Sequence, residues 1–242
     1  MKSIETLSVV ERRVLSHVSR FRLTTSTVWN RVADLRDTPY GDIGDAVGRL
    51  LREGYLISGI LIKSVRYFVL SQKGAAETAD LKLTKEQARY GLLSERAKIK
   101  ACGIMDLCAD PKVNWLPATS QESLDFYGEG VHGLPSGLLI DKGNVQFCFC
   151  RVDGSIESLP KRSAQTIRAD LLRMQKQPSL ASAINEHRLK YVFVTATKPR
   201  ADRILEQFRN YQDMKTTPIH VRVAPILVPL LQSVPIGTRI VP

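Results

Sequence analysis

The chain has 242 residues, 43% of them hydrophobic, which is enough for a substantial core in one large domain or two smaller ones. Its net charge is +11 and its isoelectric point is near 9.7, which indicates a polyanionic partner such as nucleic acid. No apolar run reaches the roughly 18 residues of a membrane span, and no hydrophobic signal segment opens the chain. We therefore expect a soluble, cytoplasmic protein without membrane association.

The positive charge is unevenly distributed. Residues 131–242 carry 16 Lys and Arg against 8 Asp and Glu, whereas residues 1–80 carry 12 against 9. Residues 81–130 are balanced, with 7 of each. A nucleic-acid surface therefore need not be confined to the N-terminal part.

Two helices are expected before residue 38. Apolar residues at helical spacing predict a first helix over residues 5–20 and a second over residues 25–35, the second containing Val28, Trp29, Val32 and Leu35. Arg22, Thr25 and Ser26 lie at the start of the second helix, where a helix N-terminus can meet backbone phosphate. The alternative is that these three side chains are simply solvated.

The stretch from residue 38 to residue 74 has the layout of a winged helix. Ile43, Val47, Leu50 and Leu51 recur at helical spacing, and Gly54 stops the helix. Residues 55–57 and 67–70 then predict a β-hairpin with a basic tip. In winged helix-turn-helix domains this helix enters the major groove and the hairpin lies along the phosphate backbone.

Five side chains in this stretch are candidate contacts to double-stranded DNA. Tyr40, Arg49 and Arg52 lie outside the apolar stripe of the helix, and Arg is the commonest partner of guanine. The other two, Lys63 and Arg66, lie on the hairpin, where contact is to phosphate.

Asp42 and Asp45 argue against a DNA-facing helix, because carboxylates repel phosphates unless one accepts a hydrogen bond from a cytosine amine. An ordinary α/β element or a protein-binding adaptor therefore stays open as an alternative.

Residues 81–110 predict a long helix, and Thr84 and Gln87 have the spacing of a capping box near its start. Its balanced charge is typical of a connector that packs on both flanking domains, or of a dimerisation helix. Sequence alone leaves both open. A homodimer is attractive because winged-helix proteins that read two half-sites are dimers.

Residues 111–133 are rich in Pro and Gly and predict a loop. Strands are expected over residues 134–140, 145–152, 191–197 and 219–228, with helices over 161–176 and from 199 onward. That order predicts an α/β sandwich with a mixed sheet. The two helices carry many cations, which are either an ordinary solvated face or a second surface that tracks phosphates.

The four cysteines lack the spacing of a zinc site, and the four histidines are scattered. Cys148 and Cys150 alternate on one face of an expected strand. We expect buried free thiols, no metal site and no cofactor.

Three runs of the sequence, "LSVVERRVLSHVSRFRLTTSTVW", "RLLREGYL…RYFVLSQKG" and "YVFVTATKPRADRILEQF", resemble the replication-relaxation family, which comprises winged-helix proteins of plasmids, phages and integrative elements. The resemblance spans most of the chain through loose patterns. It implies sequence-specific DNA binding by a transcriptional regulator, or by an accessory factor of replication or transfer in a mobile element.

The C-terminal half of such proteins is similar to the restriction-endonuclease-like core, which cleaves DNA with an Asp on one strand and an acid-x-Lys on the next. Here Pro135-Ser136 stands in place of Pro-Asp, and Cys150-Arg151-Val152-Asp153 stands where the acid-x-Lys is expected. Asp141 and Glu129 fall in an expected turn and loop. Because a divalent ion needs clustered carboxylates, we expect no catalytic residue and no enzyme. A divergent metal-dependent nuclease is the alternative.

We therefore expect a mixed α/β (α+β) chain. Residues 1–80 form a winged helix-turn-helix domain, residues 81–130 a helical connector and loop that is a candidate dimerisation element, and residues 131–242 an α/β sandwich resembling a degenerate nuclease-like core.

Overall fold

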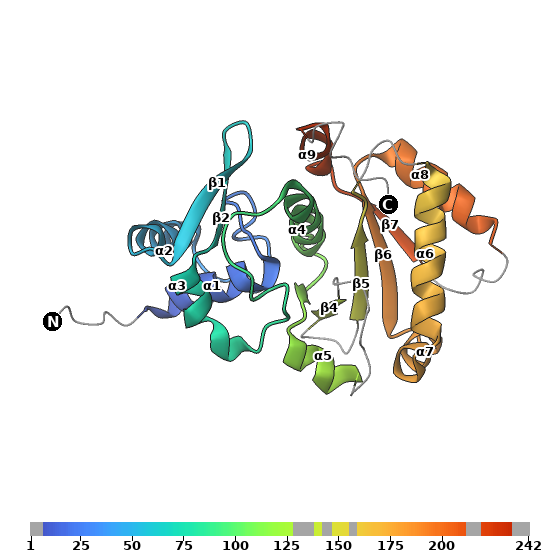
Figure 1. The fold of residues 1–242 in the computed structure, drawn as a ribbon, viewed down its shortest axis with the longest axis horizontal. Helices are drawn as coiled ribbons and strands as arrows, with labels where there is room; N and C mark the ends of the chain where they lie inside the picture. Colours follow the sequence, from blue (N-terminus) through green and yellow to red (C-terminus); the bar gives the residue numbers. More distant parts are fainter. Residues whose placement is uncertain (1–6, 128–137, 142–146, 155–158, 212–218, 234–242) are drawn as a thin grey trace.

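The structure is a computed structural model that describes residues 7–127, 138–141, 147–154, 159–211 and 219–233. These residues form mixed helices and strands, as expected for an α/β chain. A two-stranded hairpin and a five-stranded sheet lie on opposite sides of helix α4 (Glu95–Cys108) (Figure 1). None of the helices in the described ranges is long and apolar enough to cross a membrane.

The N-terminal part contains six elements in chain order: α1 (Val9–Phe21), α2 (Tyr40–Arg52), β1 (Leu56–Ile62), β2 (Val65–Leu70), α3 (Gln72–Glu77) and the 3-10 helix η1 (Ala79–Leu81). Helix α1 begins with a capping box, in which the Ser8 hydroxyl accepts from the Glu11 N–H and the Glu11 carboxylate accepts from the Ser8 N–H.

The helix expected over residues 25–35 is absent. Successive turns occupy this segment, with bonds such as Arg31 N–H to the Val28 carbonyl and Leu35 N–H to the Val32 carbonyl. The segment is rich in Thr, Val, Asn and Asp, which are weak helix formers because they are β-branched or compete for backbone hydrogen bonds. Its apolar side chains are nevertheless buried as expected.

The expected hairpin is confirmed. Leu56 pairs with Leu70 and Ile57 with Val69, and Thr24 adds an isolated bridge to Phe68. At Gly59 a side chain is excluded, because an added Cβ would lie 2.4 Å from the Tyr67 ring. A bulge between Ile60 and Ile62 precedes the tip, and bulges increase the local twist of a hairpin.

The long helix expected over residues 81–110 is also wrong. The capping box of Thr84 and Gln87 does form, with bonds of 3.1 and 3.0 Å, but only a turn follows it. Gly91 then adopts a φ of 87°, which interrupts helical backbone. Helix α4 (Glu95–Cys108) begins only after the side-chain cap of Ser94.

The C-terminal part contains the remaining elements: β3 (Trp115–Pro117), α5 (Ser120–Tyr127), β4 (Leu138–Asp141), β5 (Phe147–Val152), α6 (Pro160–Gln175), α7 (Pro178–Asn185), β6 (Leu189–Thr195), α8 (Lys198–Arg209), β7 (Ile219–Val223) and α9 (Leu227–Ser233). Strands β3, β4 and β5 are antiparallel neighbours, whereas β5, β6 and β7 run parallel. The expected mixed sheet is therefore confirmed.

Three local expectations in this part were incomplete. Residues 111–133 were expected to form a loop, yet β3 and α5 lie there. The strand expected over residues 219–228 ends at Val223, and α9 follows it. Helix α7, between α6 and β6, was not expected at all.

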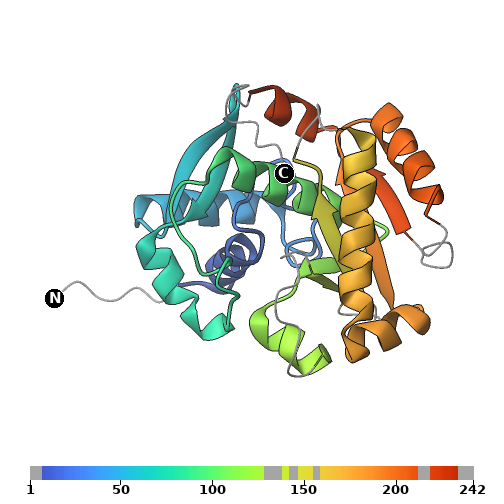
Figure 2. The same ribbon diagram turned by 45° about the vertical axis from the view of Figure 1, so that its right-hand side comes forward.

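Helices cover both faces of the five-stranded sheet. One apolar cluster contains Phe149, Tyr191 and Phe193 and packs under α6, α7 and α8. The alternate residues Cys148, Cys150 and the apolar side chains of α4 and α9 form the opposite layer. Figure 2 shows α6 lying across the sheet on one side. Period-two alternation along the strands therefore produces a three-layer arrangement.

The second of these clusters continues into the N-terminal part. It includes Phe21, Leu23 and Leu61 together with residues of α4, β5 and α9. Arg20 also forms an ion pair of 2.8 Å with Glu122 of α5. The two parts thus share apolar contacts, and the domain boundaries stay a prediction. All four cysteines are buried and free, as expected.

Candidate nucleic-acid interface

Helix α2 is amphipathic, and its apolar side packs on α1 and β1. Ile43, Val47 and Leu50 are buried there, in a cluster shared with Val14 and Leu15 of α1. Because these residues recur every three or four positions, the opposite side of the helix is left to solvent. That side carries Asp42, Asp45 and Arg52, and Tyr40 lies at its edge; all four are exposed.

The C-terminal end of α2 turns sharply at Gly54 and leads into the hairpin. Gly54 has a φ of 76°, its N–H donates to the Leu51 carbonyl, and the Tyr55 N–H donates to the Leu50 carbonyl at 2.8 Å. This pair of bonds is the Schellman motif, which glycine favours because it has no Cβ. The next residues enter β1 directly, so α2 and the hairpin are rigidly joined.

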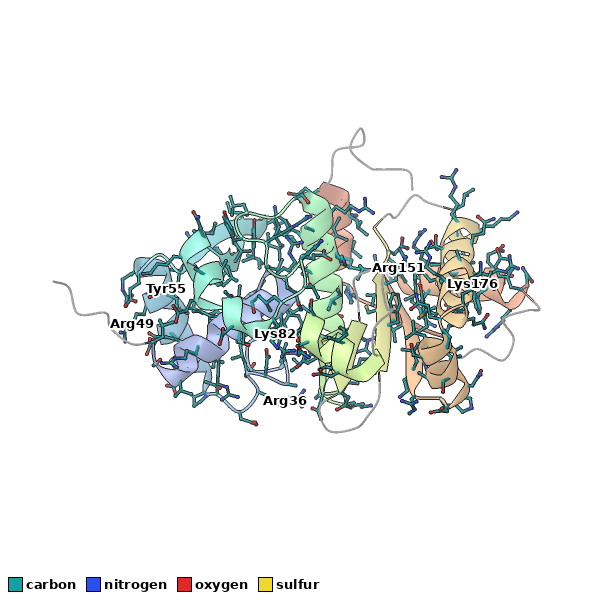
Figure 3. The ribbon with its side chains drawn as sticks, turned by 60° about the horizontal axis from the view of Figure 1, so that its bottom comes forward. Arg36, Arg49, Tyr55, Lys82, Arg151 and Lys176 are labelled. Atoms are coloured by element: carbon teal, nitrogen blue, oxygen red, sulfur yellow. The ribbon has the colours of Figure 1, made fainter. Side chains whose placement is uncertain are left out.

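Arg49 is turned back onto the protein. Its Nε lies 2.9 Å from Glu53 and 3.2 Å from Glu11 of α1. The Glu11 carboxylate is almost fully buried, with its side chain 3% exposed, so it needs a cationic partner. Figure 3 shows Arg49 at the end of the molecule formed by α1 and α2. The sequence contained no signal for the ion pair between Arg49 and Glu11, because these residues lie on different helices and are 38 positions apart.

Three of the expected contact residues remain exposed and without an ion pair in the described part of the chain: Arg52, Lys63 and Arg66. Arg52 lies on the last turn of α2. Lys63 lies in the two-residue loop at the hairpin tip with a φ of 47°, and Arg66 lies on β2 opposite Ile60. Their charges are therefore not neutralised by the residues that the structure describes.

Arg22 and Thr25 are engaged inside the protein. The Arg22 guanidinium donates to Glu86 at 3.3 Å, and burial lowers its pKa despite the opposing charge of Glu86. Thr25 is buried and shares a hydrogen bond of 2.8 Å with Thr27. Ser26 is half-buried. The structure therefore does not group Arg22 and Thr25 with the exposed cations.

Tyr40 extends the exposed side of α2 at its first turn. It is 50% exposed, and its ring lies 5.4 Å from the Trp29 ring. Trp29 in turn packs 6.0 Å from Phe68 of β2. This aromatic row links the start of α2 to the base of the hairpin, and it fixes the tyrosine at the edge of the surface.

A buried polar network that sequence reasoning missed holds the turn segment before α2. His17 Nδ1 lies 3.0 Å from the Asp34 carboxylate, and His17 Nε2 lies 2.9 Å from the Thr24 hydroxyl. Burial acts to raise the pKa of Asp34, but the charge and hydrogen bond of His17 outweigh it and leave that pKa lowered. No local pattern pointed to this network.

The hairpin also packs on the C-terminal part. Leu61 is buried in one cluster with Leu227, Leu230 and Leu231 of α9, and Ile62 and Val65 pack against it. The tip with Lys63 is exposed beyond this contact (Figure 1). The apolar side of the hairpin is therefore anchored, and its cationic side chains extend from a fixed base.

The Asp153 carboxylate, at the position where a nuclease-like core would carry a metal-binding acid, is hydrogen-bonded to other side chains of the protein. Asp153 follows β5 and is 6% exposed. Its carboxylate accepts from Arg200 of α8 at 2.5 Å and from the Thr195 hydroxyl at 3.2 Å. Pro135, Ser136 and Glu129 lie outside the described residues.

Asp141 is the last residue of β4 rather than part of a turn. Within the residues that the structure describes, no three His, Cys, Asp or Glu side chains are grouped to hold a metal ion.

Comparisons of the chain with protein-family models, with curated proteins and with solved structures find no match. The resemblance to the replication-relaxation family therefore stays a hypothesis.

Proposed function

We propose that the protein binds double-stranded DNA through the exposed side of α2 and the hairpin, as a winged helix-turn-helix protein. The observation that carries the proposal is a group of three exposed cations, Arg52, Lys63 and Arg66, that make no ion pair with the described residues. They lie on a helix and a hairpin that are joined directly at Gly54. The major groove, about 12 Å wide, admits an α-helix.

The roles within this surface differ from those expected from sequence alone. Arg49 stabilises the protein through Glu11 and Glu53, so Arg52 is the better candidate for reading guanine. Lys63 and Arg66 then contact phosphate, which contributes affinity without sequence preference. Asp42 and Asp45 are exposed on the same helix and are suited to accept from cytosine amines.

The biological role that we propose rests on the resemblance of the sequence to the replication-relaxation family. The resemblance to replication-relaxation proteins favours a cytoplasmic transcriptional regulator, or an accessory factor of replication or transfer in a plasmid, phage or other mobile element. A homodimer would let two copies of α2 read two half-sites. We assign no catalytic step to the protein, since the Asp153 carboxylate is held by Arg200 and Thr195.

The test is a salt series on a triple variant, Arg52→Gln, Lys63→Gln and Arg66→Gln. Each lost phosphate contact should reduce the slope of log affinity against log salt by about 0.9, so the loss of Lys63 and Arg66 should reduce it by about 1.8. Duplex binding is measured by fluorescence anisotropy from low to moderate salt, on the preferred site mapped from cells and on scrambled duplex.

The matched control removes the same charge elsewhere, through Lys85→Gln, Arg89→Gln and Lys112→Gln. These residues are exposed and lie in the turns before and after α4. If the two triple variants lose the same slope, binding reflects net charge alone and the proposed surface is wrong. Restoring Arg52 alone should recover preference for the mapped site over the scrambled duplex.

A further inference from the structure

The outer surface of α6 and α8 is strongly basic. Apart from Asp170 and Arg200, which are buried and paired with Arg151 and Asp153, it carries eight cations and two carboxylates. The cations are Lys161, Arg162, Arg168, Arg173, Lys176, Lys198, Arg203 and Arg209, and the carboxylates are Asp202 and Glu206. We call this the α6–α8 surface.

Most of these charges are not neutralised by carboxylates in the described part of the chain. Lys198 pairs with Asp202 at 2.6 Å, but six others make no ion pair within the described residues: Lys161, Arg162, Arg173, Lys176, Arg203 and Arg209. Elsewhere, cations such as Arg20, Arg151 and Arg222 are paired with carboxylates. An unneutralised group of this size produces a positive field that attracts a polyanion.

The spacing of these cations fits a duplex. Arg162 and Lys176 are 14 positions apart, which is about 21 Å along a helix, or about six base-pair steps of 3.4 Å. Helices α6 and α8 pack directly on each other, and packed helices lie about 8–10 Å apart. The cations of both helices therefore lie on adjoining elements, where they can contact the phosphates of one duplex.

The α6–α8 surface and α2 lie toward different ends of the molecule, whereas the hairpin packs beside α9 (Figure 1). Figures 1 and 3 both place α2 near one end of the molecule and α6 near the other. In Figure 3, Arg49 and Lys176 lie on opposite sides of α4. The α6–α8 surface is therefore separated from α2 by α4.

From this geometry we propose that the α6–α8 surface binds a second DNA duplex, so that one chain bridges two DNA segments. The bridging rests on the proposed function of α2 and the hairpin. The second surface binds through phosphate and carries no base readout, because its cations project from the sides of helices that stay packed on the sheet. The protein would thereby hold a specific site against any nearby duplex.

The test measures retention of a second duplex. A biotinylated duplex with the mapped site is fixed to beads, the full-length protein is added, and a fluorescent duplex of random sequence is then offered. Wild-type protein should retain the fluorescent duplex, and salt should release it. The variant Arg162→Gln, Arg173→Gln, Lys176→Gln should bind the fixed duplex but retain about tenfold less of the second one, since three phosphate contacts are lost.

The control with Lys85→Gln, Arg89→Gln and Lys112→Gln should retain the second duplex as wild type does. If the α6–α8 variant also retains it fully, the inference is overturned, because two α2 surfaces of a dimer then account for the bridging. A wild-type protein that binds the fixed duplex but retains no second one overturns it too. The proposed function is tested separately, by whether the variant of Arg52, Lys63 and Arg66 still binds the fixed duplex.

Discussion

The contact between α4 and the sheet can be tested at Gly103. An alanine Cβ at this position would lie 2.6 and 2.8 Å from the two methyl carbons of Val152 on β5. Ordinary carbon contacts are about 3.5–4.0 Å, so α4 must move by about 1 Å or Val152 must shift. Overpacking of this kind costs about 1–3 kcal/mol.

A second effect opposes this cost. Alanine is favoured over glycine inside a helix by about 1 kcal/mol. Gly103→Ala should therefore lower the free energy of unfolding by about 0–2 kcal/mol. In a chain with Val152→Ala the two methyl carbons are gone and the nearest remaining contact is 3.3 Å, so the same change should raise the free energy of unfolding.

The sign change is the decisive result, and the assay is a double-mutant cycle measured by urea unfolding with circular dichroism. A coupling of about 1–3 kcal/mol is expected between the two substitutions. Additive effects, within about 0.5 kcal/mol, would show that α4 does not rest on β5 through this glycine. The arrangement that separates the two proposed DNA surfaces would then be wrong.

Three further outcomes are expected from the same unfolding assay. Arg49→Ala should lower stability by about 1–2 kcal/mol, because the buried Glu11 carboxylate loses its cation, and adding Glu11→Gln should recover most of the loss; no recovery would contradict the ion pair. The lowered pKa of Asp34 means that its stabilising contribution is full above its unfolded pKa of about 3.9 and is lost as the pH falls through the folded value. The stability difference between wild type and Asp34→Asn should therefore shrink below about pH 4, and a constant difference down to low pH would refute this. Gly54→Ala should cost about 1 kcal/mol through its φ of 76° alone, since no atom lies within 4 Å of the new Cβ, whereas Gly41→Ala, equally uncrowded but helical, should stabilise the protein.

Features that depend on a few neighbouring residues were predictable from the sequence. The apolar stripe of α2, its stop at Gly54 and the strands of the hairpin were all expected near their observed positions. So was the burial of Cys148 and Cys150 on one face of β5. In each case the periodicity of the side chains and the backbone preference of glycine act over one or two turns of chain.

Helix content was overestimated where apolar spacing was helical but the local preferences were weak. Residues 25–35 bury their apolar side chains without forming a helix. At the two ends of this segment, Thr24 and Asp34 are hydrogen-bonded to the buried His17 ring. In the connector, the capping box of Thr84 and Gln87 formed, but the Gln87 amide donates to the carbonyls of Arg20 and Ala118. The side chain of Gln87 is thus bound to residues that are distant in the sequence, in a segment where the local pattern predicted a continuous helix.

The sequence by itself thus determined the mixed α/β class, the exposed side of α2, the basic hairpin tip and the cationic helices of the C-terminal part. Only the tertiary structure decided which charges are available to a partner. Arg49 and Arg22 are neutralised by Glu11 and Glu86, which are distant in the sequence, whereas no carboxylate of the described ranges pairs with Arg52. The physical reason is that an ion pair depends on the distance between two charges in space, and chain packing, not residue spacing, sets that distance.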